Sequence, residues 1–243
     1  LFATVVFLTG GVLGTFHHLY WTGTPTGVLA IGSVFSALEV VPLVLVGFEA
    51  YENYKHSFAK PWVAAYRWPI LFFVAVAFWN LVGAGLFGFL INPPLALYYM
   101  QGLNTTPLHG HTALFGVYGM LGIGLMLFCL RGLGRTAVWD EKLLKGSFWT
   151  LNIGLALMAL LSLLPQGLMQ VHAAVTHGFW YARSAEFLQQ PLMQTLVWMR
   201  MPGDIIFAVG AGMLALFVAK LYIGKAKRAP VAVTPVAEAT TGR

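Results

Sequence analysis

The chain has 243 residues, of which 58% are hydrophobic and only 9% carry a formal charge. A soluble domain would carry charge on about 25% of its residues, so this composition excludes a water-soluble protein. The formal net charge of +6 would suggest nucleic-acid binding in a soluble protein. In this chain it indicates basic loops beside a membrane, so membrane lipid and not nucleic acid is the expected partner.

Long apolar runs predict six helical segments, at 1–14, 27–50, 69–92, 108–130, 147–169 and 192–219. The last five are long enough to cross a bilayer as helices, whereas the first is too short. The chain begins at Leu1 with no charged stretch before its first apolar run, so we expect it to start inside a helix with further chain missing before it. We predict an all-α, polytopic transmembrane bundle over residues 1–228 and a disordered tail at 229–243.

The basic residues predict how the bundle is oriented. If the segments alternate, 12 of the 14 Lys and Arg residues fall on one side of the membrane, in loops 51–68 and 131–146 and at the C-terminal end. The loops of the other side carry only Arg183. Basic loops favour the cytoplasm, so we expect a cytoplasmic C-terminus.

Two adjacent histidines, His17 and His18, lie in the predicted outer loop 15–26. On a regular helix, neighbouring side chains diverge by about 100° and rarely share a metal, but in a turn they can. Gly14 before them and Gly23 after them favour a turn. Neutral imidazoles suit Fe, Cu or Zn, so this pair is a candidate metal site that needs at least one further ligand. The alternative is a chance pair in a polar loop.

Glu39 lies midway along the apolar segment 27–50. A carboxylate at that depth is unfavourable unless it is protonated, paired or close to water. Glu39 is therefore a candidate catalytic group, as a proton relay or as support for a metal site. The alternative is a neutral, structural Glu bonded to a neighbouring backbone.

His109 and His111 stand at the start of the apolar run Leu108 to Leu130. Residues two apart on a helix are separated by about 200°, so the two imidazoles point to nearly opposite sides. One helix could then ligate two different cofactors. The alternative is two hydrogen-bonded polar residues inside a bundle. We interpret His56, His172 and His177 as surface residues, the last two in outer loop 170–191.

Asp204 lies about a dozen residues into the last segment, beside Pro202 and Gly203, which should bend that helix. Arg200 is four residues earlier on the same face and can pair with Asp204. The pair is either part of a functional site or purely structural.

Three motifs together resemble the catalytic subunit of bacterial nitric oxide reductases, which belong to the haem-copper oxidase superfamily. The motifs are GTFHHLYWTGTP at 14–25, SVFSALE at 33–39 and NTTPLHGH at 104–111. The single-chain, quinol-dependent type is the most similar, because of the lead-in 104–107 and the stretch MPGD at 201–204. The resemblance covers all six segments and implies the C-terminal half of a twelve-helix core in a bacterial inner membrane.

The resemblance implies a role for each candidate residue. His17 and His18 match two of the three histidines that hold the non-haem iron. His109 matches the proximal ligand of the high-spin haem b3, and His111 matches one axial ligand of the low-spin haem b. Glu39 matches a glutamate close to the binuclear site, implicated in its protonation and structure. Asp204 resembles an acidic residue near the quinol pocket.

The implied activity is the reduction of two NO molecules to N2O and water with electrons from quinol. The family's third iron histidine, its iron-coordinating glutamate and the second haem b histidine belong to an earlier helix, so the remainder of the same polypeptide is an expected partner. The oligomeric state stays open, a homodimer included. Two alternatives remain: a terminal oxygen reductase with copper in the second site, and a secondary transporter that uses Glu39, Asp204 and the histidines as a proton relay.

Overall fold

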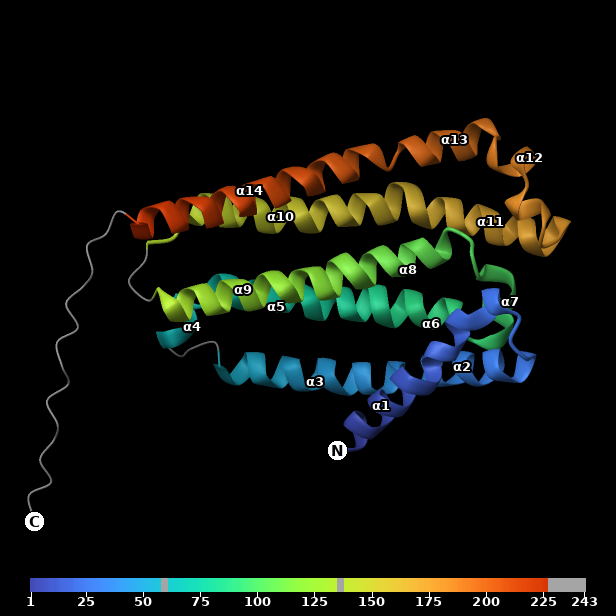
Figure 1. The fold of residues 1–243 in the computed structure, drawn as a ribbon, viewed down its shortest axis with the longest axis horizontal. Helices are drawn as coiled ribbons and strands as arrows, with labels where there is room; N and C mark the ends of the chain where they lie inside the picture. Colours follow the sequence, from blue (N-terminus) through green and yellow to red (C-terminus); the bar gives the residue numbers. More distant parts are fainter. Residues whose placement is uncertain (58–60, 135–137, 227–243) are drawn as a thin grey trace, which may run out of the picture.

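The computed structural model describes residues 1–57, 61–134 and 138–226, and within these ranges it contains helices and no β-strand. The long helices run nearly side by side as a bundle (Figure 1). Within the described ranges, five stretches are long and apolar enough to cross a membrane: Thr26–Glu49, Arg67–Ile91, Thr105–Leu133, Glu141–His177 and Pro191–Ile223. A shorter apolar helix, Thr4–Leu19, precedes them. The prediction of an all-α, polytopic membrane bundle is confirmed. The predicted tail at 229–243 lies outside the described residues.

Most of these long helices are built from several consecutive elements. The first half of the chain contains α1 (Phe2–Gly14), η1 (Thr15–Thr22), α2 (Thr26–Leu38), α3 (Val40–Ser57), α4 (Pro61–Ala65), α5 (Arg67–Trp79), η2 (Asn80–Phe87), α6 (Gly88–Ile91) and α7 (Pro94–Met100). The second half contains α8 (Thr105–Ala113), η3 (Leu114–Gly119), α9 (Met120–Leu133), α10 (Glu141–Leu157), η4 (Met158–Leu163), α11 (Leu164–His177), η5 (Tyr181–Arg183), α12 (Ala185–Leu188), α13 (Pro191–Trp198) and α14 (Met201–Ala226). Elements η1 and η5 are 3₁₀ helices. Elements η2, η3 and η4 are π-helical turns inside spanning helices, a feature often found at functional sites.

The fourth span, Glu141–His177, is longer than the predicted apolar segment 147–169. The more polar residues on both sides of that segment are also helical. At its start, the Asp140 Oδ1 atom accepts the N–H of Leu143 at 3.2 Å and caps α10. At its end, α11 continues to His177, so the predicted loop 170–191 is wrong in its first eight residues. His172 and His177 therefore lie on a helix, although their side chains are exposed as predicted.

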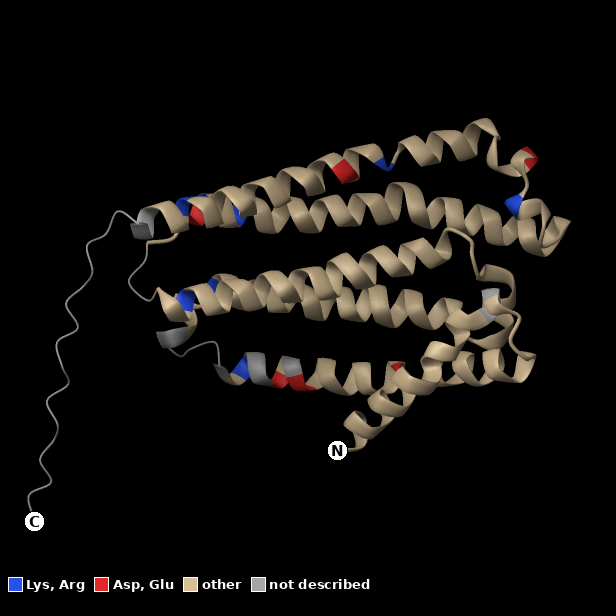
Figure 2. Cartoon of the chain, in the orientation of Figure 1, with Lys and Arg blue, Asp and Glu red and all other residues tan. Residues whose placement is uncertain are grey.

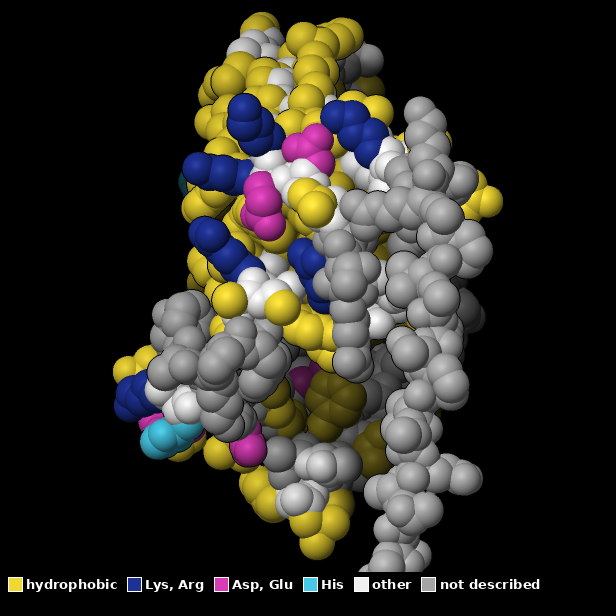
Figure 3. All heavy atoms as spheres, turned by 90° about the vertical axis from the view of Figure 1, so that its left-hand side faces the viewer, with side chains coloured by type: hydrophobic (Ala, Val, Ile, Leu, Met, Phe, Trp, Pro, Cys, Tyr) yellow, Lys and Arg dark blue, Asp and Glu magenta, His cyan; other side chains and the backbone are white. Residues whose placement is uncertain are grey.

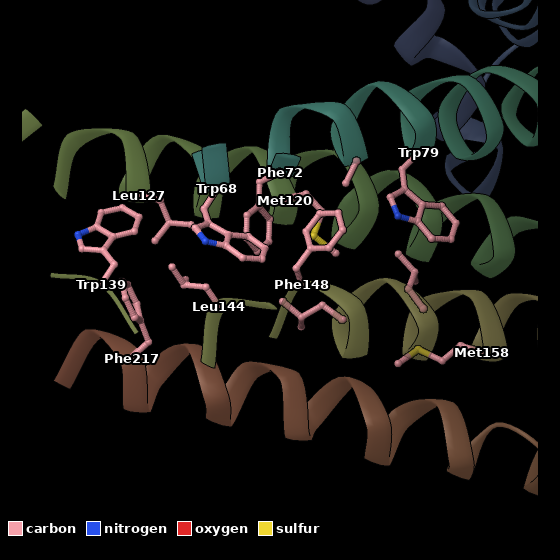
Figure 4. Close-up of a cluster of buried hydrophobic side chains, with 13 residues drawn as sticks. Trp68, Phe72, Trp79, Met120, Leu127, Trp139, Leu144, Phe148, Met158 and Phe217 are labelled. Atoms are coloured by element: carbon pink, nitrogen blue, oxygen red, sulfur yellow. The ribbon is translucent and has the colours of Figure 1, made fainter. Parts of the chain in front are cut away.

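The main hydrophobic core lies where α5 and α9 face α10 and α14. Figure 4 shows its large side chains, including Trp68, Phe72, Phe148 and Phe217, projecting into the space between these helices. Phe72 and Phe148 meet edge to face, with ring centroids 5.2 Å apart. Many other apolar side chains face outward on the spanning helices, as expected where a helix borders lipid.

Helices α10 and α14 pack along each other, and glycines allow their backbones to approach closely. A Cβ atom on Gly154 would lie 2.5 Å from the backbone nitrogen of Phe207, and one on Gly203 would lie 2.6 Å from that of Met158. Small residues at a crossing let two membrane helices gain van der Waals contact without burying large apolar groups.

The last span is interrupted between α13 and α14, just before the Pro-Gly pair for which the sequence predicts a bend. Helix α13 ends at Trp198 and α14 begins at Met201. Pro202 has no N–H to donate to the carbonyl of Trp198, so the ladder breaks there and leaves Arg200 in the gap.

Charged residues gather at one end of the bundle. Figure 2 shows most Lys and Arg residues where α3, α9 and α14 end and α10 begins, and Figure 3 shows that end in surface view. The 3₁₀ helix η5, at the opposite end, contains Arg183. The described basic residues of this group thus lie at the end where the alternating segments predict them, whereas Lys60, Arg135, Lys227, Arg228 and Arg243 lie outside the described residues.

Candidate functional site

His17 and His18 lie on η1, a 3₁₀ helix rather than the predicted turn. Gly23 ends this helix with a φ of 69°, a backbone conformation that favours glycine. Although a 3₁₀ helix separates neighbouring side chains by about 120°, the two imidazole centroids are 4.0 Å apart. The histidines therefore stay together without a turn, with His17 half-buried and His18 exposed.

Element η1 is held directly against α2. A Cβ atom on Gly32 would lie 2.4 Å from the backbone nitrogen of His17, so only glycine allows this approach. The Gln101 side chain donates from Nε2 to the His17 carbonyl oxygen at 2.9 Å. The Nδ1 atom of His17 contacts the carbonyl oxygen of Gly14. Both the backbone and the ring of His17 are thus fixed.

Glu39 stands at the junction between α2 and α3, half-buried. Its side chain packs on two glycines of α1: a Cβ atom on Gly10 would lie 2.7 Å from Glu39 Cγ, and one on Gly11 would lie 3.9 Å from Oε1. Helix α1 continues directly into η1, so Glu39 rests on the same continuous helix that presents His17 and His18.

His109 projects from α8 toward η2 and α6. Its Nδ1 atom is 2.8 Å from the carbonyl oxygen of Gly83, and a Cβ atom on Gly88 would lie 2.9 Å from its Cε1. His109 is near enough to His17 and to His18 for the protonated forms of these imidazoles to repel one another. The structure therefore brings His17, His18 and His109 into one region.

His111 projects to a different side of α8. Its Nδ1 atom is 2.7 Å from the Pro107 carbonyl oxygen, and its Nε2 atom is 3.1 Å from Nη2 of Arg200. The Nε atom of Arg200 lies 3.1 Å and 3.2 Å from the two carboxylate oxygens of Asp204. The predicted Arg200–Asp204 pair is confirmed, and it extends to His111, which the sequence did not indicate.

The backbone contacts fix which ring nitrogen is free. A carbonyl oxygen can only accept, so in a neutral imidazole the Nδ1 atom facing it must carry the proton. For His17, His109 and His111, Nε2 then keeps the lone pair that a metal needs. Metal-ligating histidines usually donate their other ring N–H in this way, so the three residues fit iron ligation. Among the described residues, no three His, Cys, Asp or Glu side chains converge as a complete metal site.

Sequence reasoning missed a buried group of amides beside α8. Gln166 and Gln170 of α11 are each 5% exposed, and both hydrogen-bond to Asn104, the residue before α8. Two glutamines four residues apart within a mostly apolar helix are the signal that could have found them, because buried amides need partners.

Comparison with known proteins places this sequence in a family. Residues 1–206 match the family described as cytochrome c and quinol oxidase polypeptide I. The chain belongs to that family. The match includes all six candidate residues, from His17 to Asp204. The resemblance to haem-copper oxidases that the sequence motifs indicate is thereby confirmed.

The chain is also similar to a nitric oxide reductase subunit of Stutzerimonas stutzeri. The two proteins are 37% identical over 115 residues, which is 47% of this chain and 23% of that relative. The match thus spans less than a quarter of the relative's length.

Proposed function

We propose that this chain forms part of the catalytic subunit of a nitric oxide reductase. The reaction combines two NO molecules with two electrons and two protons to give N2O and water. The name of the 37% identical relative supports this choice within the oxidase family. Haem b, haem b3 and a non-haem iron are the proposed cofactors, and a quinol is the proposed electron donor.

The observation that carries the proposal is the shared orientation of three histidines. In His17, His109 and His111 the Nδ1 atom faces a backbone carbonyl, which leaves Nε2 as the ligand atom. His109 and His111 leave α8 toward different neighbours, Gly83 on one side and Arg200 on the other. This arrangement supports two separate haem groups on one helix.

Each candidate residue then has a distinct task. His109 would hold haem b3, His111 would hold haem b, and His17 with His18 would hold the non-haem iron. When bound, these iron centres supply electron transfer and sites for NO. Glu39 would move protons beside the iron ligands, and Asp204 would accept a proton from the quinol. The apolar surroundings would favour a small uncharged gas over water.

The incomplete ligand sets point to partners within the same protein. A third iron histidine, an iron-coordinating glutamate and a second haem b ligand would come from other helices of the same polypeptide, because the match covers only 23% of the relative. We place the basic end in the cytoplasm of a bacterial inner membrane, with the C-terminus at that end. Membrane lipid is a further partner, and a homodimer remains open.

A terminal oxygen reductase is the second candidate, because the matched family is described as cytochrome c and quinol oxidases. Imidazole ligands fit copper as well as iron. Membership of this family gives no support to the alternative of a proton-coupled transporter.

Metal analysis and an optical spectrum of the purified whole protein test the proposal. The expected result is two haems and one non-haem iron for each catalytic subunit, with turnover of NO. One copper for every two haems would instead identify an oxygen reductase, and a haem-free spectrum would overturn both.

A further inference from the structure

The N-terminus of α8 is held by buried polar side chains of α11 and of the turn before it. Ser162 is fully buried, and Gln166 and Gln170 are each 5% exposed. These side chains lie in a span that is otherwise strongly apolar. Leaving a buried amide unpaired is costly, so their partners show what they do.

Each of the two glutamines accepts a hydrogen bond from Asn104. Its backbone N–H donates to Gln170 Oε1 at 2.8 Å, and its Nδ2 atom donates to Gln166 Oε1 at 3.1 Å. Gln166 Nε2 in turn donates to the Ser162 hydroxyl at 2.7 Å. Gln170 Nε2 is 3.4 Å from the Ala182 carbonyl oxygen in η5. The amides are satisfied, and each is oriented by a second contact.

Asn104 is the residue from which α8 starts. Its carbonyl oxygen accepts the N–H of Leu108 at 3.0 Å, which forms the first turn. His109 follows one residue later and His111 two residues after that. A helix is rigid over this length, so a displacement of Asn104 moves both imidazoles together.

The two helix backbones touch at the same level. A Cβ atom on Gly167 would lie 2.7 Å from the backbone nitrogen of Thr105 and 3.1 Å from the carbonyl carbon of Asn104. Gly167 directly follows Gln166, so this close approach brings both glutamines within reach of Asn104. The π-helical element η4, which immediately precedes α11, changes the helix register before these residues.

We propose that Gln166 and Gln170 are positioning residues that set the orientation of both haem ligands on α8. They contact neither imidazole and act through Asn104. The inference rests on the proposed function, because it requires that His109 and His111 ligate haem.

The test uses the whole protein with Gln170→Leu and, separately, Gln166→Leu. EPR spectra and potentiometric titrations would report each haem. We expect the low-spin and high-spin signals, and both reduction potentials, to shift in the same variant, because one helix carries both ligands. Gln170→Glu should restore the original spectra, because a carboxyl oxygen still accepts the N–H of Asn104.

Gln189→Leu is the matched control, because this glutamine is exposed and lies outside α11, at the end of α12. It should change neither haem. If Gln170→Leu does not accumulate, Asn104→Ala removes only the donor to Gln166 and should still shift both haems. Unchanged spectra and potentials in all three variants would overturn the inference, whereas an unsubstituted protein without haem would overturn the proposed function instead.

Discussion

Arg200 contacts the ring nitrogen of His111 that would bind a metal. Its Nη2 atom lies 3.1 Å from the imidazole Nε2, while its Nε atom pairs with Asp204. In a protein with haem b on His111, the guanidinium has to leave this position. The side chains of this ion pair are 38% and 44% accessible, so Arg200 has room to move away from His111.

Replacing His111 and replacing Arg200 should therefore have different effects. His111→Leu should lower the low-spin haem b content of the whole protein by about tenfold or more, because even supporting groups of a metal site are worth about that much. Arg200→Leu should keep haem b, since Arg200 is not a ligand. The low-spin haem signal per protein, measured by EPR, would decide. Equal loss in both variants would contradict the assignment of His111.

His109→Leu should remove the high-spin haem b3 signal and leave the low-spin signal in place. The two rings contact different neighbours, so losing one should not disturb the other. The control is His172→Leu, which replaces an exposed histidine of α11. An unchanged high-spin EPR signal in His109→Leu would show that the ligand lies elsewhere.

The sequence was sufficient for the parts that depend on local pattern. Apolar length predicts the spanning helices, and the two-residue spacing of His109 and His111 predicts that they leave α8 on different sides. It was insufficient where contacts between distant segments decide. The pairing of His111 with Arg200 joins positions 89 residues apart, and the amides of α11 meet Asn104 across more than 60 residues. The register that brings them together depends on packing and on π-helical turns, which periodicity alone does not reveal.

Glu39→Gln should reduce NO turnover by about a hundredfold with all haem retained, which is the usual scale for a lost proton-transfer group. Substitutions in α1, on which the Glu39 side chain packs, also test whether the position of this carboxyl matters. Gly10→Ala should also reduce turnover, because its new Cβ atom would lie 2.7 Å from Glu39 Cγ. Gly11→Ala is the control, since its Cβ atom would meet Oε1 at 3.9 Å, an ordinary contact. Full turnover in Glu39→Gln at every pH tested would leave a structural role only.

Acid should weaken the contact between α10 and α14 at the basic end of the bundle. The N–H of Leu143 and the ammonium group of Lys220 hold the pKa of the Asp140 carboxyl below its ordinary value. The stabilisation is thus present above the unfolded pKa of about 3.9 and is lost as the pH falls through the lower folded pKa. Asp140→Asn should remove this part of the pH dependence, while its side-chain oxygen still caps α10. Thermal unfolding at pH 7 and pH 3 would show it: an equal fall in Tm in both proteins would contradict the prediction.

Asp204→Asn should weaken quinol oxidation more than it weakens NO reduction from an artificial donor. A quinol releases two protons with its two electrons, so its pocket needs an acceptor within hydrogen-bond reach. Asp204 is the carboxylate of α14, close to the break before Met201, and it pairs with Arg200. If the Arg200–Asp204 pair is purely structural, the substitution would release Arg200 and lower quinol oxidation and NO reduction equally. The two activities should be measured on one membrane preparation, with the exposed Glu186→Gln as the control. Equal losses in Asp204→Asn would remove this residue from the quinol site and leave it as a support for Arg200.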